Sequence, residues 1–408
     1  MSRPRVLLVT KLYHPWIGGV ERHVQDLAEN LKEKGYDVKV LCCEEPRQKG
    51  SEVRGQGSEN KEKNSFTHPS PLTPHPLIIS NIPVYKAPSL GICWSMPVSL
   101  TFPFWLSKLA READIIHFHL PFPLAVLSYW PTYYLLPTTY HPRLILTWHS
   151  DVVRQKIADA LLRPWTRWFL KKAGTILVSS KNLLESSRAL KSWKSKCRVI
   201  PMGIRVENFI LTPPVKRASE RILEENEYKF LLLFVGRLIP YKGLEHLIKA
   251  ITLLPAQIKL IVIGDGAMQE SLKGQAAGLG LTKRVLFLNG LSGADLVAYY
   301  HACDLFVLSS VTNNEAFGLV QIEAMASGKP VINTWLATGV PEVSLDGETG
   351  LTVRPADPSA LAQAVEKLFK NEELRKRLGQ NALKRAHRYF SLKETVSQIE
   401  AAYNRLAQ

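Results

Sequence analysis

The sequence predicts an α/β protein with two domains, each built on a parallel β-sheet. Its 408 residues are 46% hydrophobic, which is enough for two separate cores. Short apolar runs typical of buried strands alternate with segments of helical periodicity. That alternation favours parallel sheets with crossover helices. The polar segment 206–228 contains Pro213-Pro214 and is expected to be a linker. We therefore expect domains at 1–207 and 208–387.

The first domain is expected to begin with a βαβ unit. Residues 5–10 should form a strand, 20–34 a helix that follows Gly18-Gly19, and 38–42 the next strand. Further strands are expected at 114–119, 143–148, 175–179 and 198–200. Residues 44–76 are rich in Glu, Lys, Ser, Gly and Pro, so we predict a disordered surface insertion there.

Two stretches, 87–107 and 115–142, contain no Lys, Arg, Asp or Glu. Both contain several prolines, each of which costs about 3 kcal/mol in a helix interior, so we do not expect membrane-spanning helices. We expect buried strands joined by aromatic loops, some of which would enter a membrane face. The aromatic residues concerned are Trp94, Phe102, Phe104, Trp105, Trp130, Tyr133 and Tyr134.

The second domain repeats the alternation of strands and helices. Strands are expected at 230–235, 259–264, 285–288, 304–309, 331–334 and 349–353. Helices are expected at 243–254, at 269–279, between Gly318 and Gly328, and from Ser359 and Glu372 onward. The amphipathic segment 391–406 should form a final helix.

The formal net charge of +16 is unevenly distributed. Residues 1–212 hold 29 Lys and Arg against 16 Asp and Glu, a net of +13, which leaves +3 for the remainder. The first half is therefore expected to face phospholipid, a lipid diphosphate or nucleic acid, although a merely soluble basic surface remains the plain alternative. Two basic-aromatic stretches, 163–172 and 191–196, favour an anionic membrane, unless they are ordinary solvated helix faces. Because no nucleic-acid-binding module is recognisable, we expect no nucleic-acid partner.

The five cysteines are scattered and form no C-x-x-C motif. Cys42, Cys43 and Cys303 lie in or beside apolar runs, so we expect buried thiols in a reducing compartment. The first residues lead directly into a strand, so we expect no secretory signal.

Two carboxylates, Glu315 and Glu323, stand eight residues apart around a predicted strand-to-helix turn. The first follows a buried strand, and the second lies on the helix. Backbone N–H groups of Phe317, Gly318 and Leu319 at the helix start would bind an anion. Carboxylates beside an anion site suit a sugar carried on a diphosphate.

Two cations, Arg237 and Lys242, follow the predicted strand 230–235. Ligands of open α/β sheets bind at the carboxyl ends of strands, where Arg grips a phosphate and Lys adds a compact charge. A surface Arg and Lys at an ordinary turn is the alternative. Gly18-Gly19 is the corresponding turn of the first domain. The sequence has no G-x-G-x-x-G, no phosphate-loop motif and no D-x-D triplet, so cationic groups rather than a metal would hold the diphosphate.

His149 closes the predicted strand 143–148, where its ring would hydrogen-bond a reacting sugar. A purely structural histidine is the alternative. His117 and His119 alternate along a strand, so they should share one face. No spacing of His, Asp and Glu predicts a metal site.

In order and spacing, these motifs resemble those of the family-4-like retaining glycosyltransferases with the GT-B fold (glycosyl transferases group 1). The resemblance covers nearly the whole chain. It rests on the E-x7-E element, G-R-L-I-P-Y-K-G at 236–243, I-G-D-G at 263–266, G-G-V-E-R at 18–22 and the motifs within 339–353. It implies two Rossmann-like parallel-sheet domains facing across a cleft, with a final helix, 388–408, crossing back to the first domain. The segments 147–156 and 333–343 look like those of mannosyl-type enzymes of polysaccharide assembly.

The resemblance also implies roles for individual residues. Arg237, Lys242, Glu315 and His149 would be catalytic, with Glu315 holding hydroxyls of the donor sugar. The donor would contact Gly18, Gly19, Gly236, Gly264, Gly266, Leu291, Phe317, Gly318, Leu319 and Glu323. Among these, Glu323 would bind the ribose and Leu291 would lie near the base.

The implied activity is retaining transfer of a hexose from a nucleotide-diphosphate sugar, GDP-mannose or a UDP-sugar. The acceptor would be a glycan or a polyprenyl-diphosphate-linked glycan. We expect no cofactor and no metal, and a cytoplasmic enzyme bound peripherally to the inner face of the cell membrane. A nucleotide-sugar epimerase of similar shape, which would consume donor without acceptor, and a basic nucleic-acid-binding protein are the alternatives.

Overall fold

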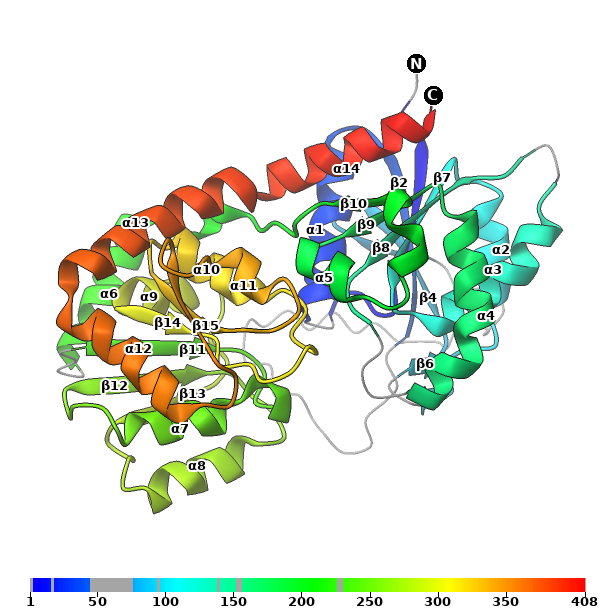
Figure 1. Ribbon diagram of the computed structural model, residues 1–408. Coiled ribbons are helices and arrows are strands. Elements are labelled where there is room, and N and C mark those ends of the chain that lie inside the picture. The colour runs from blue at the N-terminus through cyan, green and yellow to red at the C-terminus, as the bar shows by residue number, and fades with distance from the viewer. Residues whose placement is uncertain are drawn as a thin grey trace, which may run out of the picture. The chain divides into compact units, whose positions relative to one another are not determined.

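The computed structural model describes residues 3–15, 18–44, 76–93, 96–137, 140–151, 156–225 and 230–407. The chain forms two compact units, one of Met1–Leu177 with Tyr403–Gln408 and the other of Val178–Ala402. Figure 1 shows the elements of both units. The insertion predicted at 44–76 lies almost entirely outside the described residues. The domain boundary predicted at residue 207 stays a prediction.

The first sheet has the order β10-β9-β8-β7-β1-β2-β4-β3. Its strands are β1 (Arg5–Val9), β2 (Asp37–Cys43), β3 (Leu77–Ile79), β4 (Ile82–Ala87), β7 (Ile115–Leu120), β8 (Arg143–Trp148), β9 (Thr175–Val178) and β10 (Cys197–Val199). The central pairs β2–β1, β1–β7 and β7–β8 are parallel, whereas β3 runs antiparallel to β4 at the edge. The parallel sheet predicted for the first half is therefore confirmed.

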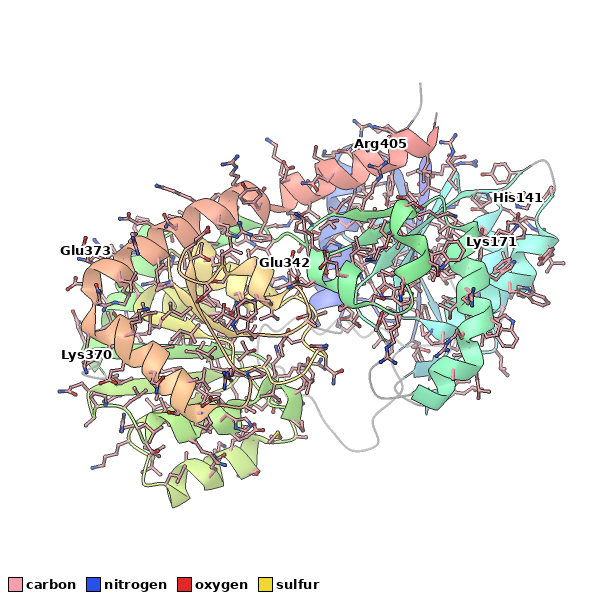
Figure 2. The ribbon with its side chains drawn as sticks, in the orientation of Figure 1. His141, Lys171, Glu342, Lys370, Glu373 and Arg405 are labelled. Atoms are coloured by element: carbon pink, nitrogen blue, oxygen red, sulfur yellow. The ribbon has the colours of Figure 1, made fainter. Side chains whose placement is uncertain are left out.

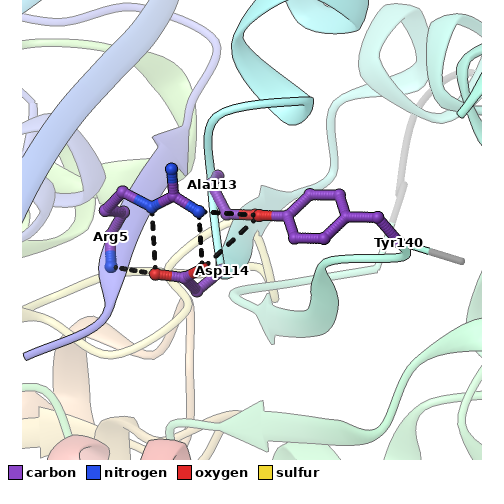
Figure 3. Close-up of polar contacts among 4 residues, drawn as sticks. All are labelled: Arg5, Ala113, Asp114 and Tyr140. Atoms are coloured by element: carbon purple, nitrogen blue, oxygen red, sulfur yellow. Dashed lines mark hydrogen bonds and ion pairs between the residues drawn. The ribbon is translucent and has the colours of Figure 1, made fainter. Parts of the chain in front are cut away.

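A polar cluster joins β1 to β7 at their amino ends (Figure 3). The guanidinium of Arg5 donates to both carboxylate oxygens of Asp114, at 3.1 and 2.8 Å, and the Arg5 backbone N–H donates to Asp114 at 2.7 Å. The hydroxyl of Tyr140 donates to the carbonyl of Ala113 at 2.6 Å. The hydrogen bonds from Arg5 lower the pKa of Asp114. This cluster lies at the end of the strands opposite to their carboxyl ends.

The helices of the first unit are α1 (Gly19–Glu33), α2 (Phe102–Ala110), α3 (Pro123–Leu135) and α4 (Lys156–Lys172), and a small hairpin pairs β5 (Gly91–Cys93) with β6 (Met96–Val98). Helix α1 buries Val24, Leu27 and Leu31, which recur at helical spacing, and the helix packs against β2 and β4. The βαβ unit predicted at the start of the chain is therefore confirmed.

The prediction of aromatic loops within 87–107 and 115–142 is wrong. Phe102, Phe104 and Trp105 lie on α2, and Trp130, Tyr133 and Tyr134 lie on α3, while Trp94 lies outside the described residues. Prolines stand in the first turn of both helices, where the missing N–H has no partner to lose. Pro131 does lie inside α3, and packing of that helix against α2 and α4 offsets the lost hydrogen bond. Nowhere in the described chain is a helix both long enough and apolar enough to cross a membrane.

The second unit contains a parallel sheet with the order β13-β12-β11-β14-β15-β16. Its strands are β11 (Phe230–Val235), β12 (Ile258–Ile263), β13 (Val285–Leu288), β14 (Leu305–Val307), β15 (Val331–Thr334) and β16 (Gly350–Val353). Side chains of β11 alternate between two hydrophobic clusters, with Leu231 and Leu233 in one and Leu232 and Phe234 in the other. Because both faces of the sheet are covered, the strands are continuously apolar, as predicted.

The helices of the second unit include α7 (Leu244–Ile251), α8 (Gln269–Gly278), α9 (Gly293–Ala302), α10 (Leu319–Ala326), α11 (Val340–Val343), α12 (Pro358–Lys370) and α13 (Glu372–Tyr389). Shorter elements are α5 (Lys181–Ser186) and the 3-10 turns η1 (Lys191–Lys196), η2 (Val206–Phe209) and η3 (Pro240–Lys242). The final helix α14 (Leu392–Ala407) begins in the second unit, and its residues from Tyr403 onward belong to the first.

The segment 206–228, expected to be a linker, is largely helical. It contains η2 and helix α6 (Pro213–Glu225), which packs against α9. Val215, Ala218, Ile222 and Leu223 lie at helical spacing and pack on the core, while most other positions of α6 are charged or polar. The amphipathic pattern was hidden because charged residues outnumber the few apolar ones.

The sequence predicted three buried thiols, and the structure confirms them as free and buried: Cys42, Cys43 and Cys303. Burial raises the pKa of the Cys303 thiol to about 12, which makes it a poor nucleophile at neutral pH.

Candidate active site

Lys242 and Glu315 form a buried ion pair in the second unit. The ammonium of Lys242 lies 2.5 Å from a carboxylate oxygen of Glu315, and both side chains are 9% exposed. Lys242 ends the turn η3 that follows β11, and Glu315 lies in the loop after β14. Strands β11 and β14 are parallel neighbours, so their carboxyl ends bring the two loops together. The structure thus joins two residues that the sequence predicted separately.

Two serines hold this pair in position. The hydroxyl of Ser310 donates to the same carboxylate oxygen of Glu315 at 2.9 Å, and the hydroxyl of Ser309 donates to the backbone carbonyl of Lys242 at 3.0 Å. Both serines are buried at the end of β14. Sequence reasoning missed them, although their place directly after an apolar strand was a usable signal.

Arg237 occupies a different setting from Lys242. It follows β11 directly and is exposed, whereas Gly236 beside it is half-buried. A side chain at Gly236 would begin 3.5 Å from the ammonium of Lys242. The exposed Arg237 thus follows the same strand end as the buried pair but stays accessible to solvent.

Helix α10 begins at Gly318 with a left-handed backbone. Gly318 has φ of 75° and ψ of 63°, and a Cβ there would lie 2.7 Å from the side chain of Leu308. Only glycine adopts this conformation without strain in the available space. Among the described residues, the backbone N–H groups of Phe317, Gly318 and Leu319 donate to no recorded acceptor. The positive end of the helix dipole, at these N–H groups, is thus available to an anion.

Glu323 lies on α10, one helical turn after the start of the helix. It is buried, and one of its carboxylate oxygens accepts a 2.7 Å hydrogen bond from the hydroxyl of Tyr300 on α9. The two acids of the E-x7-E element therefore differ in their surroundings, one paired with a cation and the other with a phenol. Sequence reasoning missed Tyr300 because α9 was not predicted.

The remaining donor-site predictions in this unit cluster after β12 and β13. Gly264 and Gly266 bring the loop after β12 against the loop after β11, since a Cβ at Gly264 would lie 2.0 Å from the carbonyl oxygen of Gly236. Leu291 is half-buried beyond the end of β13. These glycines have a packing role, whether or not a ligand also approaches them.

In the first unit, Gly18 and Gly19 stand where α1 begins, beyond the carboxyl end of β1. Gly18 caps the helix with extended backbone, and its carbonyl accepts from the N–H of Arg22 at 3.0 Å. A Cβ at Gly18 would collide with the carboxylate of Glu21 at 2.2 Å.

His149 belongs to a cluster of buried histidines in the first unit. Its Nε2 lies 3.1 Å from Nδ1 of His119, and the two rings are stacked with an interplanar angle of 16°. His117 also stacks on His119, with ring centroids 4.5 Å apart, so the predicted shared face of the strand is confirmed. His23 on α1 meets both His119 and His149 edge to face.

The outer histidine, His117, is fully hydrogen-bonded. Its Nε2 lies 2.6 Å from the hydroxyl oxygen of Thr147, and its Nδ1 lies 2.8 Å from the hydroxyl oxygen of Tyr403. By contrast, Nδ1 of His149, Nε2 of His119 and Nδ1 of His23 have no partner within the described chain. These three buried nitrogens therefore keep unused hydrogen-bonding capacity.

Burial keeps all four histidines neutral. Desolvation lowers the pKa of His23 to about 4 and that of His117 to about 3. Desolvation and the neighbouring rings also lower the pKa of His119 and His149 well below the usual value. At neutral pH the ring of His149 can thus donate or accept one hydrogen bond without carrying charge. No metal-binding group of three or more His, Cys, Asp or Glu exists among the described residues.

Comparison with known families assigns both halves of the chain. Residues 215–385 match the family described as glycosyl transferases group 1, and residues 17–208 match glycosyltransferase family 4. The D-rhamnosyltransferase WbpZ of Pseudomonas aeruginosa is 32% identical over 388 residues, which cover 95% of this chain and 92% of that protein. The O-antigen chain mannosyltransferase C of Escherichia coli is 28% identical, with 99% of each chain covered.

A solved structure shows the same fold over the whole chain. The crystal structure of Anabaena Alr3699/HepE in complex with UDP superposes with a TM-score of 0.76 at 21% identity, covering 98% of this chain and 100% of that one. The two parallel-sheet units are thus those of the GT-B fold. The chain belongs to the group 1 glycosyltransferases, as its E-x7-E element, its two Rossmann-like sheets and its full-length relatives agree.

Proposed function

We propose that this glycosyltransferase transfers a hexose from a nucleotide-diphosphate sugar with retention of anomeric configuration. The observation that carries the proposal is the buried pair of Lys242 and Glu315 near the open start of α10. A cation and free helix N–H groups suit a diphosphate, while a carboxylate suits the hydroxyls of a sugar. One ligand satisfies both requirements: a sugar attached to a diphosphate.

The reaction requires the sugar–phosphate bond to break while negative charge grows on the leaving diphosphate. Lys242, the exposed Arg237 and the start of α10 would stabilise that charge. Glu315 would orient the sugar through its hydroxyls and hold Lys242 in place. The leaving diphosphate would take the acceptor proton on the same face of the sugar, so that neither acid of the E-x7-E element need act as a nucleophile. His149, kept neutral by burial, stays the candidate of the first unit for a hydrogen bond to a sugar hydroxyl.

The names of the relatives support a first choice of sugar. Two full-length relatives are named for transfer of D-rhamnose and mannose, and rhamnose is a 6-deoxy form of mannose. These names support GDP-mannose as the first donor to test, with UDP-sugars as the second choice. The O-antigen relative supports a growing glycan, free or linked to polyprenyl diphosphate, as the acceptor.

We further propose that the reaction needs no metal and no cofactor, because cationic side chains and helix N–H groups would neutralise the diphosphate. The prediction is that chelation by EDTA leaves the rate of transfer unchanged. A loss of rate that added Mg²⁺ or Mn²⁺ restores would contradict metal independence. We place the enzyme at the inner face of the cell membrane as a peripheral protein, where a lipid-linked acceptor would lie.

A calorimetric titration of the protein with GDP-mannose, UDP-glucose and ADP-glucose tests the donor site. We expect one of these donors to bind and Lys242→Ala to weaken that binding at least tenfold, because the ammonium contacts the diphosphate. Lys249→Ala, at an exposed lysine on α7, is the matched control and should bind like the wild type. Equal affinity of Lys242→Ala and wild type would refute the role of the pair. Proton NMR of the product then reports whether the anomeric configuration is retained.

A further inference from the structure

Helix α3 in the first unit presents an apolar face to its surroundings. The exposed positions recur at i, i+3, i+4 and i+7 and form one stripe: Leu127, Trp130, Pro131 and Tyr134. The polar residues Ser128 and Thr132 lie on the buried side instead, where the hydroxyl of Thr132 donates to the carbonyl of Ser128 at 2.9 Å. A helix that faced only water would have the opposite arrangement. The pattern indicates that something apolar covers α3.

The aromatic stripe continues onto the neighbouring helix α4. The rings of Trp130 and Tyr134 lie 5.8 Å apart, and Tyr134 stacks on Trp168 of α4 with ring centroids 6.2 Å apart. Trp165, one turn earlier on α4, is 39% exposed, and Tyr134 is 63% exposed. The aromatic surface therefore extends across two helices and does not depend on one residue.

Positive charge borders this surface. Arg163, Arg167 and Lys171 are exposed and recur every four residues along α4 (Figure 2 labels Lys171). Lys172 lies 4.2 Å above the ring of Tyr133 and donates to its hydroxyl at 2.9 Å. Helix α3 carries no charged residue, and α4 carries five Lys and Arg against a single Asp. We call the exposed residues Trp130, Tyr134, Trp165, Arg167 and Lys171 the aromatic-basic face.

We propose that the aromatic-basic face docks the enzyme onto an anionic phospholipid surface. Trp and Tyr prefer the level of the lipid headgroups, where their rings enter the apolar boundary and their polar atoms stay hydrated. Exposed Lys and Arg beside them attract the negative headgroups. A second copy of the chain is a poorer occupant, because pairing two such faces would bring their cations together. The inference rests on the proposed function for its purpose, which is to bring the site to a lipid-linked acceptor.

Sedimentation with lipid vesicles tests the inference. The full-length protein should pellet with vesicles of phosphatidylcholine and phosphatidylglycerol, and less with pure phosphatidylcholine. Raising the salt from about 0.1 M to about 1 M should weaken the binding, because the Debye length falls to roughly 3 Å. A wild-type protein that stays in solution with anionic vesicles at low salt overturns the inference.

Paired variants separate the two contributions. Arg167→Gln with Lys171→Gln should lower vesicle affinity roughly 30-fold at low salt, given the attraction expected for each charge near an anionic surface. Lys249→Gln with Lys367→Gln removes the same charge from exposed positions on α7 and α12, and should leave affinity close to that of the wild type. If the two pairs weaken binding equally, net charge rather than the aromatic-basic face is responsible, and the proposal fails.

The aromatic contribution has its own control. Trp130→Ser with Tyr134→Ser should reduce vesicle binding at both low and high salt, whereas Leu253→Ser with Leu279→Ser, at exposed leucines of the second unit, should not. Light scattering of the same proteins reports self-association. Suppose that the wild type forms dimers but does not bind vesicles, and that the Trp130 and Tyr134 substitutions dissociate these dimers. The face would then belong to a second copy of the chain, and lipid docking would be refuted.

Nucleotide-sugar binding measured on every variant keeps this test apart from that of the catalytic site. All the variants should bind donor like the wild type, because none alters the ion pair. Absent vesicle binding with intact donor binding would refute the docking surface alone. Absent donor binding with intact vesicle binding would refute only the proposed function.

Discussion

At the scale of single residues, the candidate site depends on one acid and one base that lie 73 positions apart in the chain. Each was recognisable from its place after an apolar strand, because ligands bind at the carboxyl ends of parallel strands. Their contact at 2.5 Å was not predictable, since it depends on which strands are neighbours in the sheet. The same holds for Tyr300, whose hydrogen bond to Glu323 joins α9 to α10, whereas Ser310 lies only five residues before Glu315 in the same loop.

Replacement of Glu315 by Gln tests the pair at this scale. The amide keeps the size of the side chain but removes the charge that holds Lys242, so we expect kcat/KM to fall by about 10²–10³, as for loss of one preorganised contact. Glu373→Gln, at an exposed acid on α13, is the control and should retain full activity. The measurement is a steady-state rate of sugar transfer, with circular dichroism to show that each variant is folded. An unchanged rate in Glu315→Gln would remove the acid from the mechanism.

At the scale of elements, the sequence predicted every strand of the second sheet within about two residues, but it predicted no helix at α9 and was wrong at α2, α3 and α6. Strand prediction succeeded because strands covered on both faces are continuously apolar. The failures have two physical causes. Prolines at the starts of α2 and α3 looked like breaks, although the first turn of a helix tolerates them. The apolar face of α6 is too narrow to recognise among its charged residues.

Helix α10 offers a prediction about an element start. Gly318→Ala should destabilise the protein by about 1–3 kcal/mol, because the left-handed backbone disfavours a Cβ and Leu308 occupies its place. It should also weaken nucleotide-sugar binding by displacing the N–H groups at the helix start. Gly274→Ala is the matched control, since Gly274 lies inside α8 with open space around it, and alanine there should stabilise by about 0.5–1 kcal/mol. Denaturant unfolding measures both effects. Equal changes of the same sign in the free energy of unfolding of the two variants would contradict this account of α10.

At the scale of the whole molecule, the stability of the fold should depend on the buried histidines of the first unit. Each has a folded-state pKa below its unfolded value of about 6.5, so the unfolded chain binds protons more readily. Stability is therefore complete above about pH 6.5 and falls as the pH drops toward the folded-state values. The slope is roughly 1.4 kcal/mol per pH unit for each histidine.

Urea unfolding between pH 7.5 and pH 4.5 measures this dependence. The free energy of unfolding should decrease on acidification, and His23→Asn should reduce the slope below pH 6.5 even if it lowers stability overall. His387→Asn, at an exposed histidine on α13, should leave the slope unchanged. A wild-type stability that is independent of pH over this range would show that the histidines are hydrated or already charged in the folded protein.

The hydrogen bond between Tyr403 and His117 has a consequence for how the protein is made. Tyr403 belongs to the first unit, although 225 residues of the second unit, Val178–Ala402, come between it and the rest of that unit. During translation, the amino-terminal half emerges from the ribosome with the Nδ1 of His117 still lacking its phenol. That half reaches its final form only after residue 403 has been added, so a ribosome stalled before codon 403 would hold a first unit that is more easily cut by proteases than the same unit in the released chain.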